Sequence, residues 1–588
     1  MGARASKHKQ PGPAVAAKAA GENGLSVRSL GVMLGAAALT VGLAVLSFAP
    51  FDAWPLAFVA LVPWLIVVCS AQSARRMYVV SYLLGVAFFC TSVYWLFLVT
   101  GLGAGVLFAI FGVHFPLMAC PLRHLVRRRG WRLVWVFPLV WVGSEAVRSL
   151  FLLQFPWNLL GHTQHNVLAM IQVSDLVGAY GVSFVVAAVN GALADLLLNR
   201  WGWPKAPRAD FTAPGPRASL IAAGVLLAAN LVYGAVQLRA TRGAMRDGPK
   251  IAVLQGNYPN YVDVADHPEL PTQVDRANRY FELLDAAEED KPDLFLLPET
   301  PWYMYLNHEY LASGPGERWS QQCYDAFRER AMAYDAYIVT GSMSVDETPL
   351  DLRANERRYN SAFVFPPDGS TPARYDKIHL VMIGEYVPFR YGPLRFIYLW
   401  INRIGPFYSE DSEYSLSAGT TFTTFEMTAA DGKKYGFATP ICYENVMPYI
   451  ARRFVLDATG HKRCDFLLNM SNDGWFLHST ELPQHLAISV FRAVENRVGM
   501  ARAVNTGISC FIDPDGRIHD EVTVNGRAVG PNVDGFRVAH VQVDPQVTVY
   551  SRFGDWFAIG CAVTWGVFYL DYTLARSTRR RRRREAQA

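Results

Sequence analysis

Residues 433–448 read Lys-Lys-Tyr-Gly-Phe-Ala-Thr-Pro-Ile-Cys-Tyr-Glu-Asn-Val-Met-Pro. The apolar run 435–441 predicts a strand, and the run 446–456 predicts a helix. Cys442 lies at the turn between them, where backbone N–H groups and the positive end of a helix dipole favour thiolate over thiol. Cys442 is therefore a candidate nucleophile, although a single cysteine beside apolar residues is more often an inert core residue.

The composition indicates a membrane protein with more than one folding unit. The chain has 588 residues, of which 51% are hydrophobic and only 18% charged. The apolar residues gather before position 240 and again near the C-terminus, in runs of roughly the 20 residues that a bilayer core requires. Eight membrane spans are predicted, at residues 28–48, 54–71, 77–98, 100–121, 131–153, 167–197, 218–238 and 557–575.

Basic residues predict the orientation of these spans. Alternate loops carry Arg75 and Arg76, then Arg123, Arg127, Arg128, Arg129 and Arg132, then Arg200, Lys205 and Arg208. By the positive-inside rule these loops, the basic N-terminus and the arginine run 579–584 are cytoplasmic, which places both termini inside and residues 241–555 outside. The arginine run could also be a nucleic-acid-binding tail, but beside a span it is more simply a lipid-headgroup anchor, and no nucleic-acid partner is expected.

Five regions follow from these patterns. We expect a disordered basic cytoplasmic tail (1–27), a seven-helix transmembrane domain (28–240), an outward catalytic domain (241–555), a C-terminal transmembrane helix (556–576) and a basic cytoplasmic tail (577–588). The spans contain few ionisable residues. Glu145 and Arg148 are three apart on one helix face and are expected to pair, and Asp175 stands alone.

The outward domain alternates short apolar runs with amphipathic helices, a pattern typical of an α/β fold. Strands are predicted at 251–255, 294–298, 337–341, 362–365, 422–427, 435–441, 466–470, 509–512 and 538–543, and helices at 272–287, 317–334 and 481–499. Asp-Gly pairs at Asp368, Asp431 and Asp515 predict tight turns between adjacent strands.

Two further runs provide partners for Cys442. Glu299 ends a buried strand in the run 294–300, and Lys377 and Glu385 lie in the run 374–389. A desolvated carboxylate can take a proton from a thiol, and a lysine can stabilise a developing oxyanion. Glu299, Lys377 and Cys442 together make a complete set for acyl transfer.

These residues and their flanking motifs resemble the nitrilase superfamily, and within it the membrane-embedded apolipoprotein N-acyltransferase family. The resemblance rests on residues 255–257, 298–300, 375–377, 384–388, 441–444, 471–476, 484–485, 502–507 and 551–555. It implies an eight-span helical bundle joined to a nitrilase-like αββα sandwich. It also implies that Glu299 is the general base, Cys442 the nucleophile and Lys377 the oxyanion-stabilising cation.

The same resemblance assigns supporting residues. Glu385 and Glu444 orient the lysine and the thiol, and Asn472, Tyr443 and Trp475 lie near the substrate. Relatives often have Trp shortly after the Gln-Gly-Asn motif, where this chain has Tyr258 and Tyr261, so substrate contacts there differ from the family pattern.

The resemblance implies a bacterial inner-membrane enzyme with a periplasmic catalytic domain. It would move an acyl chain from a phospholipid, through a Cys442 thioester, to the α-amine of the S-diacylglyceryl cysteine of an apolipoprotein. We expect ping-pong kinetics, a monomer and no cofactor or metal. The alternatives are a membrane-tethered amidase acting on a soluble amide, and a transporter or receptor with a non-catalytic outer domain.

Three aromatic segments and the cysteines complete the predictions. The loop 155–158 suits a position at the membrane interface where a lipid could enter. The run 389–407 fits either an amphipathic segment in the interface or a buried core helix, and residues 302–310 either a mobile segment or core. Cys323, Cys464 and Cys510 allow at most one disulfide if Cys442 stays free. His478 and His485 are interpreted as surface or pocket polarity rather than zinc ligands.

Overall fold

The structure is a computed structural model that describes residues 27–152, 154–201, 215–260, 270–313, 318–346, 357–390, 392–404, 415–528, 530 and 533–587. Residues 1–26 of the predicted tail, the loop residues Lys205 and Arg208, and Tyr261 lie outside this range.

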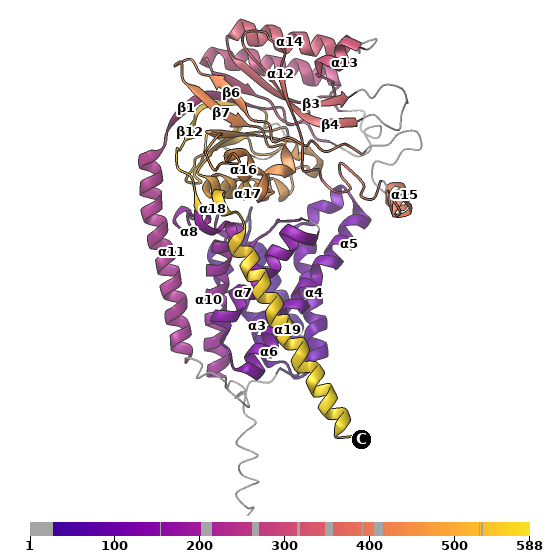
Figure 1. The fold of residues 1–588 in the computed structure, drawn as a ribbon, viewed down its shortest axis with the longest axis vertical. Helices are drawn as coiled ribbons and strands as arrows, with labels where there is room; N and C mark the ends of the chain where they lie inside the picture. Colours follow the sequence, from indigo (N-terminus) through magenta and orange to yellow (C-terminus); the bar gives the residue numbers. More distant parts are fainter. Residues whose placement is uncertain are drawn as a thin grey trace, which may run out of the picture.

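The N-terminal part forms a helical bundle below the α/β domain (Figure 1). Its segments are α2 (Leu30–Ser47), η1 (Trp54–Phe58), α3 (Val62–Ser70), α4 (Ala74–Ser92), η2 (Tyr94–Leu98), α5 (Gly101–Gly112), α6 (His114–His124), η3 (Leu125–Arg129), α7 (Leu133–Val147), η4 (Arg148–Leu152), η5 (Leu160–Gln164), α8 (Leu168–Ile171), α9 (Ser174–Val177), α10 (Ala179–Arg200) and α11 (Pro216–Ala244). The chain returns to the bundle through α19 (Trp556–Glu585), which continues as one helix through most of the predicted basic tail.

Six helices in the described residues are long and apolar enough to cross a bilayer: Leu30–Ser47, Gly101–Arg129, Leu133–Phe151, Ala179–Arg200, Pro216–Ala244 and Trp556–Arg582. The predicted span at 54–71 is a 3₁₀ turn followed by a short helix, so the count of eight stays a prediction. The predicted span 167–197 is broken, because Gly178 adopts φ +69° and α10 begins only at Ala179.

Glu145 and Arg148 do not form the predicted ion pair in the part of the chain that the structure describes, because each side chain hydrogen-bonds other groups, mainly the backbone of the loop that follows. Glu145 Oε1 accepts hydrogen bonds from the Leu160 N–H (2.7 Å) and from Trp141 Nε1 (2.8 Å). Arg148 donates to the carbonyls of Phe155 (2.8 Å) and Trp157 (2.6 Å). The loop 155–158 is consequently buried in the protein rather than open to lipid.

Two six-stranded sheets form the outward domain, with strand orders β12-β1-β2-β3-β4-β5 and β11-β10-β9-β8-β7-β6. The first contains β1 (Arg246–Gln255), β2 (Leu294–Leu296), β3 (Tyr337–Asp346), β4 (Arg357–Phe365), β5 (Ala373–Asp376) and β12 (Gly535–Val543). The second contains β6 (Phe425–Thr428), β7 (Lys434–Ala438), β8 (Phe466–Ser471), β9 (Gly499–Val504), β10 (Cys510–Ile512) and β11 (Ile518–His519). The three Asp-Gly turns join β4 to β5, β6 to β7 and β10 to β11, as predicted.

Helices cover the outer face of each sheet, which confirms the αββα sandwich. In Figure 1, α12 (Gln273–Ala287) and α14 (Arg318–Tyr334) lie above the first sheet, while α16 (Pro448–Val455) and α17 (Glu481–Asn496) lie between the second sheet and the bundle. Strand alternation explains the layers. Ile251 and Val253 of β1 belong to the core between the sheets, and Ala252 and Leu254 to the core under α12 and α14.

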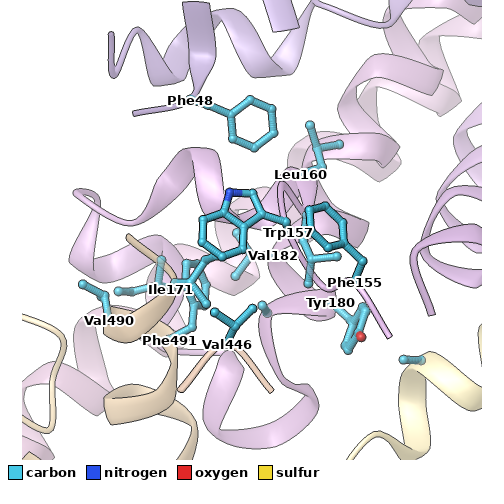
Figure 2. Packing of buried hydrophobic residues seen from close by; sticks show 14 of the residues in the cluster. Phe48, Phe155, Trp157, Leu160, Ile171, Tyr180, Val182, Val446, Val490 and Phe491 are labelled. Carbon is cyan, nitrogen blue, oxygen red and sulfur yellow. The ribbon is translucent and has the colours of Figure 1, made fainter. Parts of the chain in front are cut away.

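The bundle and the α/β domain share one hydrophobic core. Figure 2 shows Trp157 and Ile171 of the bundle beside Val446, Val490 and Phe491 of the catalytic domain. A buried ion pair also joins the two parts, because Arg497 at the end of α17 contacts Asp175 at 2.7 Å. The catalytic domain is thus packed onto the bundle over a buried surface rather than attached by a linker.

The structure decides between the predicted alternatives for two aromatic segments: one is buried in the core and the other is exposed. Trp302, Met304 and Leu306 are fully buried beneath α12 and α14, so residues 302–310 belong largely to the core and are not a mobile segment. In contrast, α15 (Arg395–Ile404) exposes Phe396 (67%) and Trp400 (64%). The buried-core alternative for the run around α15 is therefore wrong, and Figure 1 shows this helix projecting beside the upper end of the bundle.

The remaining segments near the site are α13 (His308–Ser313), η7 (Glu288–Asp290), η8 (Cys442–Asn445), η9 (Asp473–Phe476) and α18 (Val549–Phe553). The predicted helix 481–499 ends earlier, since Arg497 adopts a left-handed conformation and β9 begins at Gly499. The sequence patterns did not predict β5, β9 or β11, which are either short or buried on both faces.

Candidate active site

The predicted catalytic residues lie immediately beyond the ends of strands in both sheets. Glu299 follows β2, Lys377 follows β5, and Cys442 opens η8 after β7. Because β2 and β7 pair in parallel with their neighbours β3 and β8, the ends of these strands form shared edges at which side chains converge. The structure thus brings together three residues that are far apart in the sequence.

Lys377 is the centre of a buried ion-pair network. Its side chain is 1% exposed, and its Nζ lies 3.2 Å from Glu299 Oε1 and 2.8 Å from Glu385 Oε1. Burial alone would lower the pKa of Lys377, but the carboxylates of Glu299 and Glu385 outweigh it and hold the pKa well above its ordinary value. The lysine is therefore a fixed ammonium group, which is the form that can stabilise an oxyanion.

Asn360 completes this network, and the sequence analysis did not single it out. Its Nδ2 donates to Glu299 Oε1 (2.6 Å) and to Glu385 Oε1 (3.0 Å). The backbone N–H of Asn472 donates to the other oxygen of Glu299 at 2.9 Å. The predicted strand began at residue 362 and therefore excluded Asn360, which lies in the polar first half of β4.

The predicted thiolate at Cys442 is not what the structure favours. Burial raises the pKa of Cys442 well above its ordinary value, and the charge of Glu299 raises it further against the opposing effect of Lys377. Packing around the thiol thus outweighs the helix-end effect, although part of the residue's surface stays accessible. The structure therefore favours a neutral thiol at Cys442, and the φ of +50° at this residue lies in a sparsely populated turn conformation.

Glu444 joins the loop after β5, which contains Lys377, to the turn after β7, which contains Cys442. Its Oε1 accepts hydrogen bonds from Tyr375 Oη (2.7 Å) and from the N–H groups of Ile378 (2.7 Å) and His379 (3.0 Å). Its Oε2 accepts from the Ile441 N–H at 2.9 Å. Burial raises the pKa of Glu444, while these donors oppose the rise. Glu444 therefore fixes the two loops relative to each other.

The remaining predicted residues are Tyr443, Asn472 and Trp475. Tyr443 stacks on His379, with ring centroids 5.8 Å apart, and donates to the carbonyl of Gln154 in the bundle at 3.0 Å. Asn472 Oδ1 accepts from Asn505 Nδ2 at 3.0 Å, and Trp475 is half-buried in η9. The tyrosine beside the nucleophile thus contacts the membrane part of the protein directly.

Comparison with known proteins identifies the family. Residues 41–192 match the apolipoprotein N-acyltransferase N-terminal domain, and residues 250–529 match the carbon-nitrogen hydrolase family. The chain is 31% identical to the apolipoprotein N-acyltransferase of Geobacter metallireducens over 538 residues, covering 89% of this chain and 92% of that protein. The chain belongs to the apolipoprotein N-acyltransferase family.

Apolipoprotein N-acyltransferase 2 of Treponema pallidum is 29% identical and covers 81% of both chains. Among solved structures, an amidase from Nesterenkonia sp. AN1 is 16% identical with a TM-score of 0.33, covering 52% of this chain and 96% of that one. The resemblance predicted from the sequence motifs is confirmed, and family membership makes the chain an acyltransferase.

A polar cavity adjoins the loop after β5, which contains Lys377. Its volume is about 960 Å³, and its lining includes Gln154, Arg357, His379, Tyr386 and Ser417. Burial and the nearby charge of Lys377 lower the pKa of His379 to about 4, so this imidazole is neutral at physiological pH.

All eight cysteines lie in the described residues, and all are free thiols. His485, interpreted from the sequence as surface or pocket polarity, is buried and lies 3.2 Å from Asp473 and 3.5 Å from Glu481. These three side chains could hold a cation by proximity, but Arg502 already binds Asp473 at 3.0 Å and supplies positive charge there.

Replacing Glu444 with Gln should lower the rate of acyl transfer strongly and the stability of the fold only moderately. The amide would keep one acceptor oxygen, but its NH₂ would face the Ile441 N–H, which would lose its acceptor. We expect a stability loss of about 1–3 kcal/mol and acyl transfer slower by up to about 10²-fold, because the cysteine loop shifts relative to Lys377. Thermal unfolding and single-turnover acylation measure the two effects.

The matched control is Glu426→Gln, which removes an exposed carboxylate paired with Lys434 on β6. It should leave both measurements nearly unchanged. Equal effects of the two variants on acylation would contradict the role given to Glu444.

Proposed function

We propose that this protein transfers an acyl chain from a membrane phospholipid to the α-amine of the S-diacylglyceryl cysteine of bacterial apolipoproteins. The observation that carries the proposal is the buried set of Glu299, Lys377 and Cys442 in a domain that packs directly onto a membrane bundle. A site for soluble substrates would not need this placement. The names of the relatives support the same substrates.

In the first step, Glu299 takes the proton of the Cys442 thiol as Sγ attacks the ester carbonyl of the phospholipid. The oxyanion that forms is stabilised by the Lys377 ammonium group. Collapse of this intermediate breaks the ester C–O bond, and Glu299 returns the proton to the departing lysophospholipid oxygen. The products are a thioester on Cys442 and a lysophospholipid.

In the second step, the neutral α-amine of the lipoprotein cysteine attacks the thioester carbonyl. Glu299 takes a proton from the attacking nitrogen, Lys377 again stabilises the oxyanion, and the C–S bond breaks. The proton returns to Sγ, which restores the thiol and releases the amide. Because both substrates use Cys442 in turn, the scheme predicts ping-pong kinetics.

We further propose that the catalytic domain is periplasmic, that both termini are cytoplasmic and that the boundaries near residues 240 and 556 separate membrane from catalytic parts. The change from α11 to β1 after Ala244 and the start of α19 at Trp556 agree with these boundaries. The arginine cluster of η3 lies beside the middle of α19, since Arg129 contacts Asp571 at 2.5 Å. Because one chain supplies the whole site, the proposed unit is a monomer.

The soluble-amidase and transporter alternatives are less well supported. In an amidase the bundle would serve only as an anchor, yet it shares a core with the catalytic domain and contacts Tyr443. A transporter would not require the buried Lys377 network.

A mass spectrum of the purified protein incubated with phospholipid tests the proposal. We expect one added acyl mass on the peptide containing Cys442, and its loss when a diacylated lipopeptide is added. Acyl label on another residue, or no label with any phospholipid, would contradict it. Ammonia release from a soluble amide without lipid would favour the amidase instead.

A further inference from the structure

Gln484 sits where the membrane bundle meets the catalytic domain. Its Oε1 accepts hydrogen bonds from Nε1 of Trp157 (2.9 Å) and Trp95 (3.2 Å), which come from two different bundle segments. Its Nε2 donates to the carbonyls of Ser92 (3.0 Å) and Ala49 (3.4 Å). A glutamine amide has two donors and two acceptor positions, so this buried side chain uses its full capacity on the bundle.

The same two tryptophans also pack on the segment beside the catalytic base. The ring of Trp95 lies edge-on to Phe476, with centroids 4.7 Å apart, and Phe476 ends η9. The ring of Trp157 lies 5.7 Å from that of His485. Gln484 thus holds two aromatic rings, of which one packs on η9 and the other on His485 of α17.

A buried polar chain continues from this contact to Glu299. His485 Nδ1 lies 3.2 Å from Asp473 Oδ1, and Asp473 is fixed further by Ser471 Oγ (2.6 Å) and by Arg502 (3.0 Å). Asp473 directly follows Asn472, whose N–H donates to Glu299 Oε2. Displacement of η9 would therefore move the donor that orients the catalytic base.

We infer that Gln484 is a positioning residue through which the membrane bundle holds the Asn472 N–H on Glu299. The inference rests on the base role proposed above for Glu299. It implies that the bundle does more than present lipid, because a bundle contact sets the geometry of the proton-transfer group. Gln484 itself contacts neither substrate nor the thiol.

The test compares Gln484→Leu with Gln172→Leu. Gln172 is also a fully buried glutamine at the same interface, bonded to the Asp515 carbonyl (2.9 Å) and to Arg497 (2.7 Å), but its contacts do not lead to η9. The readout is the rate of Cys442 acylation by p-nitrophenyl butyrate, followed by intact mass across a pH series. Acylation by this small ester requires neither a phospholipid nor a lipoprotein. The test of Gln484 therefore remains valid if the proposed lipid substrates are wrong.

We expect Gln484→Leu to slow acylation by about 10- to 100-fold. The acid limb of its pH–rate profile should move to higher pH, since the Glu299 carboxylate loses a donor. Gln172→Leu should lower the thermal midpoint by a similar amount, with a normal rate and profile. The gentler Trp157→Phe, which removes one N–H but keeps the ring, should show the same profile shift with a smaller loss of rate.

Equal acylation rates in the two glutamine variants, or a slower Gln484→Leu enzyme with an unmoved acid limb, would overturn the inference. The first outcome would show that Gln484 only stabilises the interface. The second would show that Gln484 affects the rate without affecting the environment of Glu299.

Discussion

Cys442→Ser is expected to lower acyl transfer to a diacylated lipopeptide by about 10⁴-fold or more, the largest effect of any single change in this protein. Serine fits the same space, but its hydroxyl is a far weaker acid than a thiol, and the site already disfavours the ionised nucleophile by burial and by the charge of Glu299. The added acyl mass should disappear with the activity. Steady-state transfer and intact-protein mass measure the two.

Cys323→Ser is the control for this change. Cys323 is a buried thiol of α14 that accepts a hydrogen bond from Trp302 Nε1 at 3.3 Å, and a serine oxygen can accept the same bond. The variant should keep its transfer rate. Transfer that survives in Cys442→Ser, or is lost equally in Cys323→Ser, would exclude Cys442 as the nucleophile.

The sequence was informative for those candidate site residues that have a reactive side chain just beyond the end of a strand. Glu299 and Cys442 each follow an apolar run, whereas Lys377 follows the short strand β5, which contains Arg374 and Asp376; the ends of these strands meet in the structure. The protonation state of Cys442 was predicted wrongly because it depends on burial and on a carboxylate 143 positions away in the chain, neither of which a local pattern contains.

Contacts between the two domains were the least predictable feature. The Gln484-His485 motif helped to identify the family, but its role depends on two tryptophans nearly 400 and more than 300 residues away. Likewise, Glu145 and Arg148 have the spacing of a helix ion pair, yet loop backbone groups that need partners inside the bundle take both side chains. Spacing along a helix cannot reveal this competition.

Lys377→Met should damage both catalysis and stability, and the two losses should respond differently to pH. Acylation should fall by about 10²–10³-fold because the oxyanion loses its only cation in the Glu299, Lys377 and Cys442 set. Removing the ammonium also leaves Glu299 and Glu385, which share Asn360, as neighbouring buried carboxylates, at a cost of about 3–5 kcal/mol at neutral pH.

That stability loss should shrink as the pH falls, since one proton shared by the two carboxylates returns the net charge of the site to its wild-type value. In the wild type, Lys377 has a raised pKa, so its stabilising contribution is present throughout the acidic and neutral range and is lost only at strongly alkaline pH. Thermal midpoints of both proteins between pH 5 and pH 8 should therefore converge toward pH 5.

The double variant Lys377→Met/Glu385→Gln, which removes one of the two charges, should regain stability at neutral pH without regaining activity. A stability difference that is constant with pH would show that Lys377 acts by packing alone, whereas recovery of activity in the double variant would show that its charge is not what stabilises the oxyanion.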